Sequence, residues 1–352
     1  MGEKRPTDKS FLSDLFWTAF NFLRMYIIGL GWLWQQLVDP HRKLKDLPKR
    51  TGETAIVTGG ARGIGVEVVK QLLQADMRVI IGCRDVAIGN RVIKEILASG
   101  IKTGTAECIQ LDLESLQSVR MFAKAFLKLG TSLSVLVNNA AYFGPHRMTI
   151  DGFEAQLQIN YLGHFLLTVL LIPALIRAGK VGKCSRVVNV TSMVSKLGNI
   201  EFDDFLMKKY YNRNVAYCNT KLMQVISSNY LNNRFLAEKL PIECYSVHPG
   251  VVRTNLFIHF QLYRILMLML RIVGWPPSKG SDSIVYTAFS EELEGHGGKM
   301  VSNCTFVTPN PQADDALIQL RLWEMSCNLT KLEGSKQAST IVPDPFILVD
   351  IE

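Results

Sequence analysis

The sequence predicts an α/β protein with a doubly wound parallel sheet in a single domain, preceded by an N-terminal membrane-anchor helix. Three observations carry this prediction. From Thr54 onward short apolar strands alternate with helical segments, a glycine-rich turn follows the first strand, and a long apolar run precedes the domain. Strands separated by helices indicate right-handed βαβ units, which form a parallel sheet covered on both faces.

The composition supports one large domain with appendages. Hydrophobic residues make up 48% of the 352 residues, so the chain can bury a sizeable core. The net charge of +8 is spread along the chain, which suits phosphates and an anionic membrane surface, and we expect no nucleic-acid partner. The 7 cysteines and 6 histidines lack ligand spacing, so we expect a reducing compartment and no metal.

The run from Phe16 to Val38 carries Arg24 as its only charged residue. A bilayer core needs about 20 residues, and Trp17, Trp32 and Trp34 lie where interfacial aromatics belong. A transmembrane anchor is the favoured interpretation, but the internal arginine leaves a monotopic helix and a segment packed on the domain open. Basic residues are more frequent after the run than before it, which places the main domain in the cytosol.

The alternation of apolar and polar residues gives approximate bounds for the elements of the domain. We expect strands at Thr54–Thr58, Arg78–Ile81, Thr105–Gln110, Leu133–Val137, Arg186–Val190 and Ile242–Val247. We expect helices at Val66–Gln74, Asp85–Ala98, Phe153–Arg177 and Ala216–Leu236, with further helices filling the other intervals.

The turn Thr58-Gly-Gly-Ala-Arg-Gly-Ile-Gly65 fits the pattern T-G-x-x-x-G-x-G between a strand and a helix. Its glycines let backbone N–H groups approach a pyrophosphate at the helix N-terminus. An NAD site usually has an acidic residue at the end of the second strand, but here Cys83 and Arg84 stand there. Arg62 and Arg84 suit a 2′-phosphate, so we predict NADP(H) over NAD(H); the alternative is two surface arginines.

Polar residues follow several of the other strands. Asp112 could accept a hydrogen bond from an adenine amino group, and Asn138-Asn139-Ala140 ends the fourth strand at the ligand-binding edge. Ser192 ends the fifth strand and could donate to a substrate oxygen. Asn160 lies in an apolar helix, where it either bonds a functional group or is a helix-kinking core amide.

Tyr217 and Lys221 are four residues apart and therefore share one face of a helix. An ammonium beside a phenol favours the phenolate. Lowering a tyrosine pKa from about 10 to about 7 requires about 4 kcal/mol, which one lysine rarely supplies, so a cationic cofactor ring or hydroxyl donors should help. In isolation, such a pair is most often the solvated side of a helix.

Together, these residues resemble the short-chain dehydrogenase/reductase family. The resemblance covers about residues 52 to 305 and includes Pro249-Gly250-Val-Val-Arg-Thr254. Gly82-Cys-Arg-Asp85, Asn160-Tyr-Leu-Gly-His-Phe165 and Glu291-Glu-Leu-Glu-Gly-His-Gly-Gly-Lys299 are similar to its retinol-dehydrogenase-like branch, which includes WW-domain and X-linked oxidoreductases. The resemblance implies a Rossmann-type fold and a nicotinamide cofactor.

The family's roles can be assigned to matching positions. The resemblance implies that Tyr217 is the general acid/base, Lys221 lowers its pKa and holds the nicotinamide ribose, Ser192 positions the substrate oxygen, and Asn160 supports a proton relay. It implies cofactor binding by Thr58, Gly59, Arg62, Gly63, Ile64, Gly65, Arg84, Asp112, Asn139, Tyr217, Lys221, Pro249, Gly250, Val252 and Thr254.

The sequence departs from the family pattern in two places. Ala141 replaces the glycine that usually follows Asn-Asn-Ala, and Lys196–Asn214 is longer than the family minimum, so we expect an extra loop or short helix there.

The segment after Thr254 is expected to cover the substrate. It is rich in Leu, Ile, Met and Phe, and Arg264 and Arg271 share one helical face. It is either a lid packed on the core or a lid that also enters the membrane interface. Both interpretations favour a lipophilic alcohol and its aldehyde or ketone, with a retinoid or a polyisoprenoid preferred to a steroid. A cofactor-binding scaffold without turnover is the alternative from a different functional class.

The expected organisation follows from these segments, with the enzyme at the endoplasmic reticulum or a lipid-droplet surface and a homodimer left open. We expect a tail and anchor at 1–40, a basic linker at 41–51, a catalytic domain at 52–330 with its lid at 256–277, and a tail at 331–352.

Overall fold

The computed structural model describes residues 29–209, 211–254, 256 and 273–332. The chain divides into two compact units, 1–40 and 41–352. Within the first unit, residues 29–38 are helical. Most of the expected anchor and most of the expected lid lie outside the described residues.

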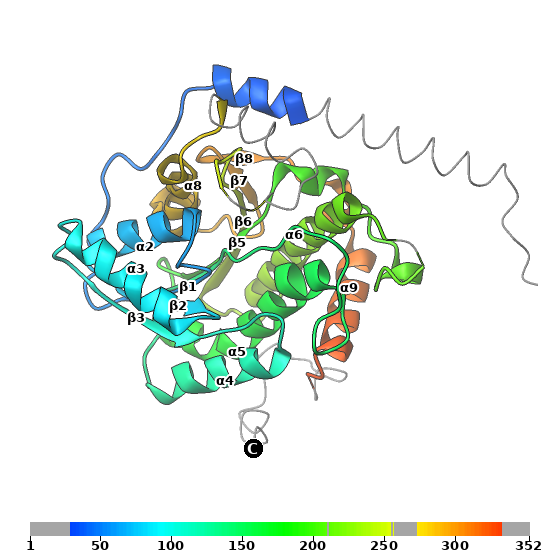
Figure 1. The fold of residues 1–352 in the computed structure, drawn as a ribbon, viewed down its shortest axis with the longest axis horizontal. Helices are drawn as coiled ribbons and strands as arrows, with labels where there is room; N and C mark the ends of the chain where they lie inside the picture. Colours follow the sequence, from blue (N-terminus) through cyan, green and yellow to red (C-terminus); the bar gives the residue numbers. More distant parts are fainter. Residues whose placement is uncertain (1–28, 210, 255, 257–272, 333–352) are drawn as a thin grey trace, which may run out of the picture. The chain divides into compact units, whose positions relative to one another are not determined.

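The second unit contains one sheet of eight strands in the order β3-β2-β1-β4-β5-β6-β7-β8 (Figure 1). Every neighbouring pair is parallel except β7 and β8. The order reverses between β1 and β4, so the predicted doubly wound fold is confirmed, with its switch point beside the glycine turn. The strands are β1 Thr54–Thr58, β2 Arg78–Cys83, β3 Thr105–Gln110, β4 Val135–Asn138, β5 Ser185–Val190, β6 Ile242–His248, β7 Met300–Ser302 and β8 Thr305–Val307.

Helices cover both faces of the sheet, as Figure 1 shows. One face carries α2 Ile64–Gln74, α3 Val86–Ala98 and α8 Pro277–Phe289, whose apolar side chains pack on the strands in one core cluster. The other carries α4 Leu116–Lys128, α5 Gly163–Ala178 and α6 Arg213–Ala237, with α9 Ala316–Leu329 packed on α6. The strands are buried on both faces, which explains their nearly continuous apolar sequences.

The predicted strands are confirmed with small shifts at their ends. The fourth strand begins at Val135 rather than at Leu133, because the amide of Leu133 donates to the carbonyl of Ala174 instead of to a neighbouring strand. The strands β7 and β8 and the helices α8 and α9 lie in stretches to which the sequence patterns assigned no bounds.

The predicted long helix over Phe153–Arg177 is interrupted. A π-helical turn, η1 Leu157–Leu162, leads directly into α5. The amide of Gly163 donates to the carbonyl of Gln158, five residues earlier, and π-helical turns frequently mark functional sites. Among the described residues, Leu157–Ala178 is the one helix long and apolar enough to cross a membrane, but 89% of its most apolar window is buried, so it is a core helix.

The segment 41–51, expected as a linker, belongs to the same compact unit as the sheet. His41 Nε2 lies 2.7 Å from Asp282 Oδ2 on α8, and an Arg50 guanidinium nitrogen donates to the carbonyl of Phe289. The amide of Arg42 donates to Asn303 in the turn between β7 and β8. These contacts attach the segment to α8 and to the turn between β7 and β8.

Candidate active site

The glycine turn forms a close-packed link between β1 and α2. Gly59 and Gly63 have φ angles of 66° and 54°, in the region that favours glycine. A Cβ on Gly65 would lie 2.4 Å from the carbonyl oxygen of Gly59, so no larger residue fits without moving backbone. The turn therefore exposes backbone at the start of α2, the geometry that admits a pyrophosphate.

Thr58 and Asn139 attach this turn to the end of β4. Thr58 Oγ1 accepts hydrogen bonds from the amides of Asn139 and Ala140 at 2.9 and 3.0 Å. In return, Asn139 Nδ2 donates to the carbonyl oxygen of Thr58 at 2.9 Å. Thr58 Oγ1 also lies 2.9 Å from His164 Nε2 on α5. Hydrogen bonds of the Thr58 and Asn139 side chains thus hold β1 and β4 together at the switch point of the sheet.

A groove of about 730 Å³ runs from the glycine turn across the ends of β2 and β3. Its walls include Arg62, Arg84, Asp112 and Tyr142. One oxygen of Asp112 accepts a hydrogen bond from the amide of Glu114, which fixes the direction of the carboxylate. The donors, glycines and volume of this groove fit the adenosine and phosphate parts of a dinucleotide.

Two arginines predicted to read the cofactor line this groove, and both are exposed. Arg84 donates through Nη1 to Glu114 Oε1 at 3.0 Å. Asp85 is the acidic residue that follows β2 most closely along the chain. Its carboxylate caps α3 by accepting a hydrogen bond from the amide of Ile88 at 3.0 Å. One oxygen of this carboxylate is therefore already engaged by the helix.

The structure brings together a pair of thiols beside the groove, a contact that the spacing of the cysteines in the sequence did not predict. Cys83 Sγ lies 3.2 Å from Cys108 Sγ, because both residues point to the same face of neighbouring strands. A Cβ on Gly89 of α3 would lie 2.3 Å from the Cys108 sulfur, so this glycine makes room for the pair. The hydrogen bond from Cys108 lowers the pKa of Cys83 to about 7.

Tyr217 and Lys221 lie on the buried face of α6, with 7% and 2% of their surfaces exposed. Lys221 Nζ lies 5.7 Å from the centre of the Tyr217 ring and donates to the carbonyl of Val190 at 2.8 Å and to Gln224 Oε1 at 2.9 Å. The Tyr217 ring packs edge-on against Phe143 at 5.4 Å. The pair therefore points into the protein toward the ends of β4 and β5, not into solvent.

Burial shifts both titrating groups of this pair. It raises the pKa of Tyr217 above its usual value and lowers the pKa of Lys221 to about 7. Both shifts have the same cause, since a buried site disfavours the phenolate and the ammonium alike. Lys221 alone therefore does not lower the tyrosine pKa, and a further positive charge or hydroxyl donor is needed beside the phenol.

Asn160 is a fully buried side chain within the π-helical turn. Its Oδ1 accepts from the amide of Tyr142 at 2.7 Å, and its Nδ2 donates to the carbonyl of Tyr142 and to Thr220 Oγ1. The side chain thus attaches the chain after β4 to α6, next to the Tyr217 turn. The backbone carbonyl oxygen of Asn160 lies 3.3 Å from His164 Nδ1.

Ser192 follows β5 and caps a short 3-10 helix, η2 Met193–Leu197, which packs on α6. The neighbouring Thr191 donates to the carbonyl of Lys221 at 2.8 Å, so the end of β5 is attached to the turn of α6 that carries the pair. The extra segment Lys196–Asn214 contains the rest of η2 and a second 3-10 helix, η3 Phe202–Asp204, as expected. Asn310 Nδ2 holds the segment through the carbonyls of residues 195, 196 and 198, a contact with no sequence signal.

The chain after β6 lies across the glycine turn. Gly250 has a φ of 87°, which turns the backbone, and a Cβ placed on Gly63 would lie 3.6 Å from Thr254 Cγ2. Val252 pairs with Trp275 in an isolated parallel bridge, and Trp275 rests against the His41 ring. Pro249, Gly250, Val252 and Thr254 are thereby held near the other predicted cofactor residues.

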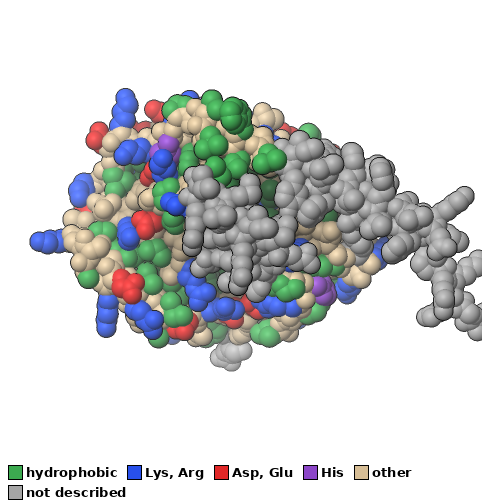
Figure 2. Space-filling view, turned by 45° about the horizontal axis from the view of Figure 1, so that its top comes forward, with side chains coloured by type: hydrophobic (Ala, Val, Ile, Leu, Met, Phe, Trp, Pro, Cys, Tyr) green, Lys and Arg blue, Asp and Glu red, His purple; other side chains and the backbone are tan. Residues whose placement is uncertain are grey.

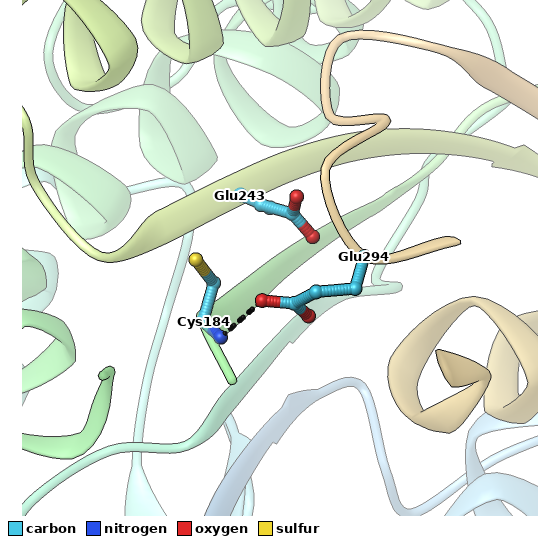
Figure 3. A group of neighbouring side chains, drawn as sticks. All are labelled: Cys184, Glu243 and Glu294. Carbon is cyan, nitrogen blue, oxygen red and sulfur yellow. Dashed lines mark hydrogen bonds between the residues drawn. The ribbon is translucent and has the colours of Figure 1, made fainter. Parts of the chain in front are cut away.

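One cluster of potential metal ligands lies near the N-terminal ends of β5 and β6, away from the strand ends that carry the site (Figure 3). Cys184, Glu243 and Glu294 converge there. The two carboxylates already have a cation, because the buried guanidinium of Arg186 lies 3.7 Å from Glu243 and 3.1 Å from Glu294. Tyr245 also donates to Glu243 at 2.9 Å. This arrangement is a satisfied structural ion network.

Charged residues on the described part of the face in Figure 2 are mixed, with lysine and arginine side chains interspersed with acidic ones.

Comparison with known proteins agrees with this geometry. The family described as short chain dehydrogenase matches residues 53–261. A polyprenol dehydrogenase from Danio rerio is 37% identical over 318 residues, which are 89% of this chain and 97% of that protein. Retinol dehydrogenase 11 from Homo sapiens is 38% identical over 284 residues, 80% of this chain and 86% of that protein.

Solved structures show the same fold. An uncharacterized protein from Mycobacterium paratuberculosis superposes with a TM-score of 0.67 at 29% identity, covering 83% of this chain and 98% of that one. The fold and the dinucleotide groove define an α/β dehydrogenase. The chain belongs to the short-chain dehydrogenase family, and it is an oxidoreductase of that family.

Proposed function

We propose that this protein is a membrane-associated, NADP(H)-dependent oxidoreductase that interconverts a lipophilic alcohol and its aldehyde or ketone. The observation that carries the proposal is the buried Tyr217–Lys221 pair, attached to the ends of β4 and β5 through Asn160 and Thr191. The relatives named polyprenol dehydrogenase and retinol dehydrogenase support a retinoid or a polyisoprenoid as the substrate.

The glycine turn, Asp112 and the segment 249–254 would hold the cofactor. Backbone amides of Gly63, Ile64 and Gly65 at the start of α2 would bind the pyrophosphate, and Asp112 would accept from the adenine amino group. Asn139 would hold the turn in its binding conformation through its bonds to Thr58 and Gly59.

NADP(H) is preferred because two cations lie at the ribose position, while Asp85 and Glu114 in the groove wall already accept hydrogen bonds from other groups. Arg62 and Arg84 line the groove there, while the Asp85 carboxylate caps α3. A guanidinium matches the geometry of a phosphate. NAD(H) is the less favoured alternative.

The chemistry that the nicotinamide supplies when bound is hydride transfer to or from the carbinol carbon. Tyr217 would exchange the accompanying proton at its hydroxyl oxygen, and Ser192 would orient the substrate oxygen toward it. Lys221 uses two of its three donors on Val190 and Gln224, so its third can hold a ribose hydroxyl. The needed lowering of the Tyr217 pKa would then come from the charge and hydroxyls of the assembled site rather than from Lys221 alone.

Two apolar segments of the sequence, 16–38 and 256–277, support a lipid substrate. The run 16–38 would anchor the protein to the endoplasmic reticulum or a lipid droplet with the catalytic domain in the cytosol. The apolar segment 256–277 would cover the substrate.

A turnover screen tests the function directly. Purified full-length protein in detergent is assayed with retinoids, polyprenols and sterols, each with NADP(H) and NAD(H). We expect oxidation or reduction of a retinoid or a polyprenol with NADP(H). Turnover of sterols alone would overturn the substrate class, and cofactor binding without turnover of any of these alcohols or their carbonyl partners would indicate the scaffold alternative.

A further inference from the structure

Three charged side chains from three different loops meet at the wall of the cofactor groove. Glu114 follows β3, Arg84 follows β2 and Arg147 follows β4, and all three line the groove. Arg147 donates through Nη1 to Glu114 Oε2 at 2.5 Å and through Nη2 to Oε1 at 2.7 Å. Arg84 donates to the same Oε1 at 3.0 Å. One carboxylate is therefore shared by two guanidinium groups.

The two arginines hold this carboxylate with different strength. Arg147 makes a bidentate pair and its guanidinium also lies over the Tyr142 ring, 4.7 Å from the ring centre. Bidentate arginine–carboxylate pairs are among the stronger hydrogen-bonded contacts. Arg84 makes a single bond, and 62% of its side chain is exposed. Arg84 is thus the partner that can leave Glu114 at low cost.

Glu114 remains charged at the pH of the cytosol. Its side chain is 18% exposed, and the hydrogen bonds from Arg147, followed by the charges of Arg147 and Arg84, hold the pKa of the carboxyl below its usual value. A full negative charge therefore lies beside the arginine that would meet a 2′-phosphate. Without compensation it would repel the phosphate and compete for Arg84.

We propose that Arg147 determines cofactor specificity through Glu114: it neutralises that carboxylate and leaves Arg84 free to turn to the 2′-phosphate of NADP(H). This inference rests on the proposed NADP(H) preference. Arg147 is a positioning residue, because it contacts Glu114 and Tyr142 and is not assigned a contact with the cofactor. Since NAD(H) lacks the 2′-phosphate, its binding should depend much less on the pair.

The test measures dissociation constants of the full-length protein in detergent for NADPH and NADH. Removing only the cation, in Arg147→Gln, should weaken NADPH binding about tenfold and leave NADH binding within about threefold. Removing both charges, in Glu114→Gln with Arg147→Gln, should restore most of the NADPH affinity. Arg234→Gln is the matched control, since Arg234 on α6 forms a similar pair with Glu238, the residue that follows the helix, at 2.7 Å.

Each result decides between a specificity role and a structural role. Equal weakening for NADPH and NADH in Arg147→Gln, or no recovery in the double variant, would mean that the pair only braces the loops and would overturn the inference. A wild-type preference for NADPH that Arg147→Gln leaves unchanged would overturn it too. Equal affinity of the wild type for both cofactors would overturn the NADP(H) preference itself, and this inference with it.

Discussion

Lys221 holds its ammonium nitrogen 5.7 Å from the centre of the Tyr217 ring, on a helix face where both side chains are buried. Val190 and Gln224 accept hydrogen bonds from Lys221 and so orient its side chain. Burial has opposite effects on the pKa values of the two residues, since it disfavours charge on both.

Replacing Tyr217 by Phe should strongly lower turnover while leaving the cofactor bound. General acid/base groups contribute about 10²- to 10⁴-fold, so we expect a loss of that size in kcat with a lipid alcohol. Steady-state kinetics and NADPH titration measure the two effects. Tyr230→Phe, on the same helix, is the matched control. Unchanged kcat in Tyr217→Phe would rule out the catalytic role.

Replacing Cys83 by Asp together with Arg84 by Ala should shift preference toward NAD(H). The aspartate would supply the acceptor for ribose hydroxyls, and the missing guanidinium would weaken phosphate binding. We expect the ratio of kcat/KM for NADPH over NADH to fall about tenfold or more. Arg91→Ala, on the exposed side of α3, is the control. An unchanged ratio would refute the cofactor assignment.

Cys83 should be the thiol that alkylating agents modify first. It is half-buried in the groove wall, and the hydrogen bond from Cys108 lowers its pKa to about 7. Cys184 is also half-buried, but burial raises its pKa to about 12, so it serves as an internal control. Peptide mass spectrometry after brief N-ethylmaleimide treatment at pH 7.5 should find Cys83 modified, and NADPH should protect it. Faster labelling of Cys184 would contradict this assignment.

The fold should lose stability as the pH falls below about 6.5, in part through His164. Burial lowers the pKa of His164 to about 3, so between about pH 3 and 6.5 the unfolded chain binds more protons than the folded one. Stability therefore rises with pH across this window, and His164 accounts for about 1 kcal/mol between pH 5 and pH 6.

Urea unfolding at pH 5, 6 and 7 measures this dependence. His164→Gln should flatten the dependence, while His296→Gln, on an exposed turn, should not. A His164→Gln variant with the wild-type pH dependence would show that this imidazole does not titrate as described, whatever its absolute stability.

Removing residues 1–40 should release the protein from membranes. The run 16–38 is the longest apolar stretch before the domain and carries one charge. Fractionation of cells expressing the truncated and full-length chains measures the change, with a chain lacking 333–352 as the control truncation. Retention of the 1–40 truncation in the membrane fraction would transfer the anchoring role to 256–277.

Much of the fold could be predicted because its signals are local. The apolar run of Thr54–Thr58 and the glycines at 59, 63 and 65 describe a strand, a turn and a helix start that depend on neighbouring residues only. The short β7 and β8 gave no such signal, because three-residue strands carry too little alternation. Within the π-helical turn, the Asn160 side chain bonds the backbone of Tyr142 in the loop after β4. Such a contact leaves no trace in the apolar periodicity, which therefore predicts a continuous helix.

By itself, the sequence determined which functional motifs the parallel sheet carries and in what order. These are the glycine turn, the polar residues at the strand ends and the Tyr217–Lys221 pair. Only the tertiary structure decided how these groups are charged and held. Burial at the end of β5 lowers the pKa of Lys221, and the meeting of three loops brings Glu114 between Arg84 and Arg147. Such effects arise from groups far apart in the chain, where desolvation and charge pairing depend on distance in space rather than on spacing in sequence.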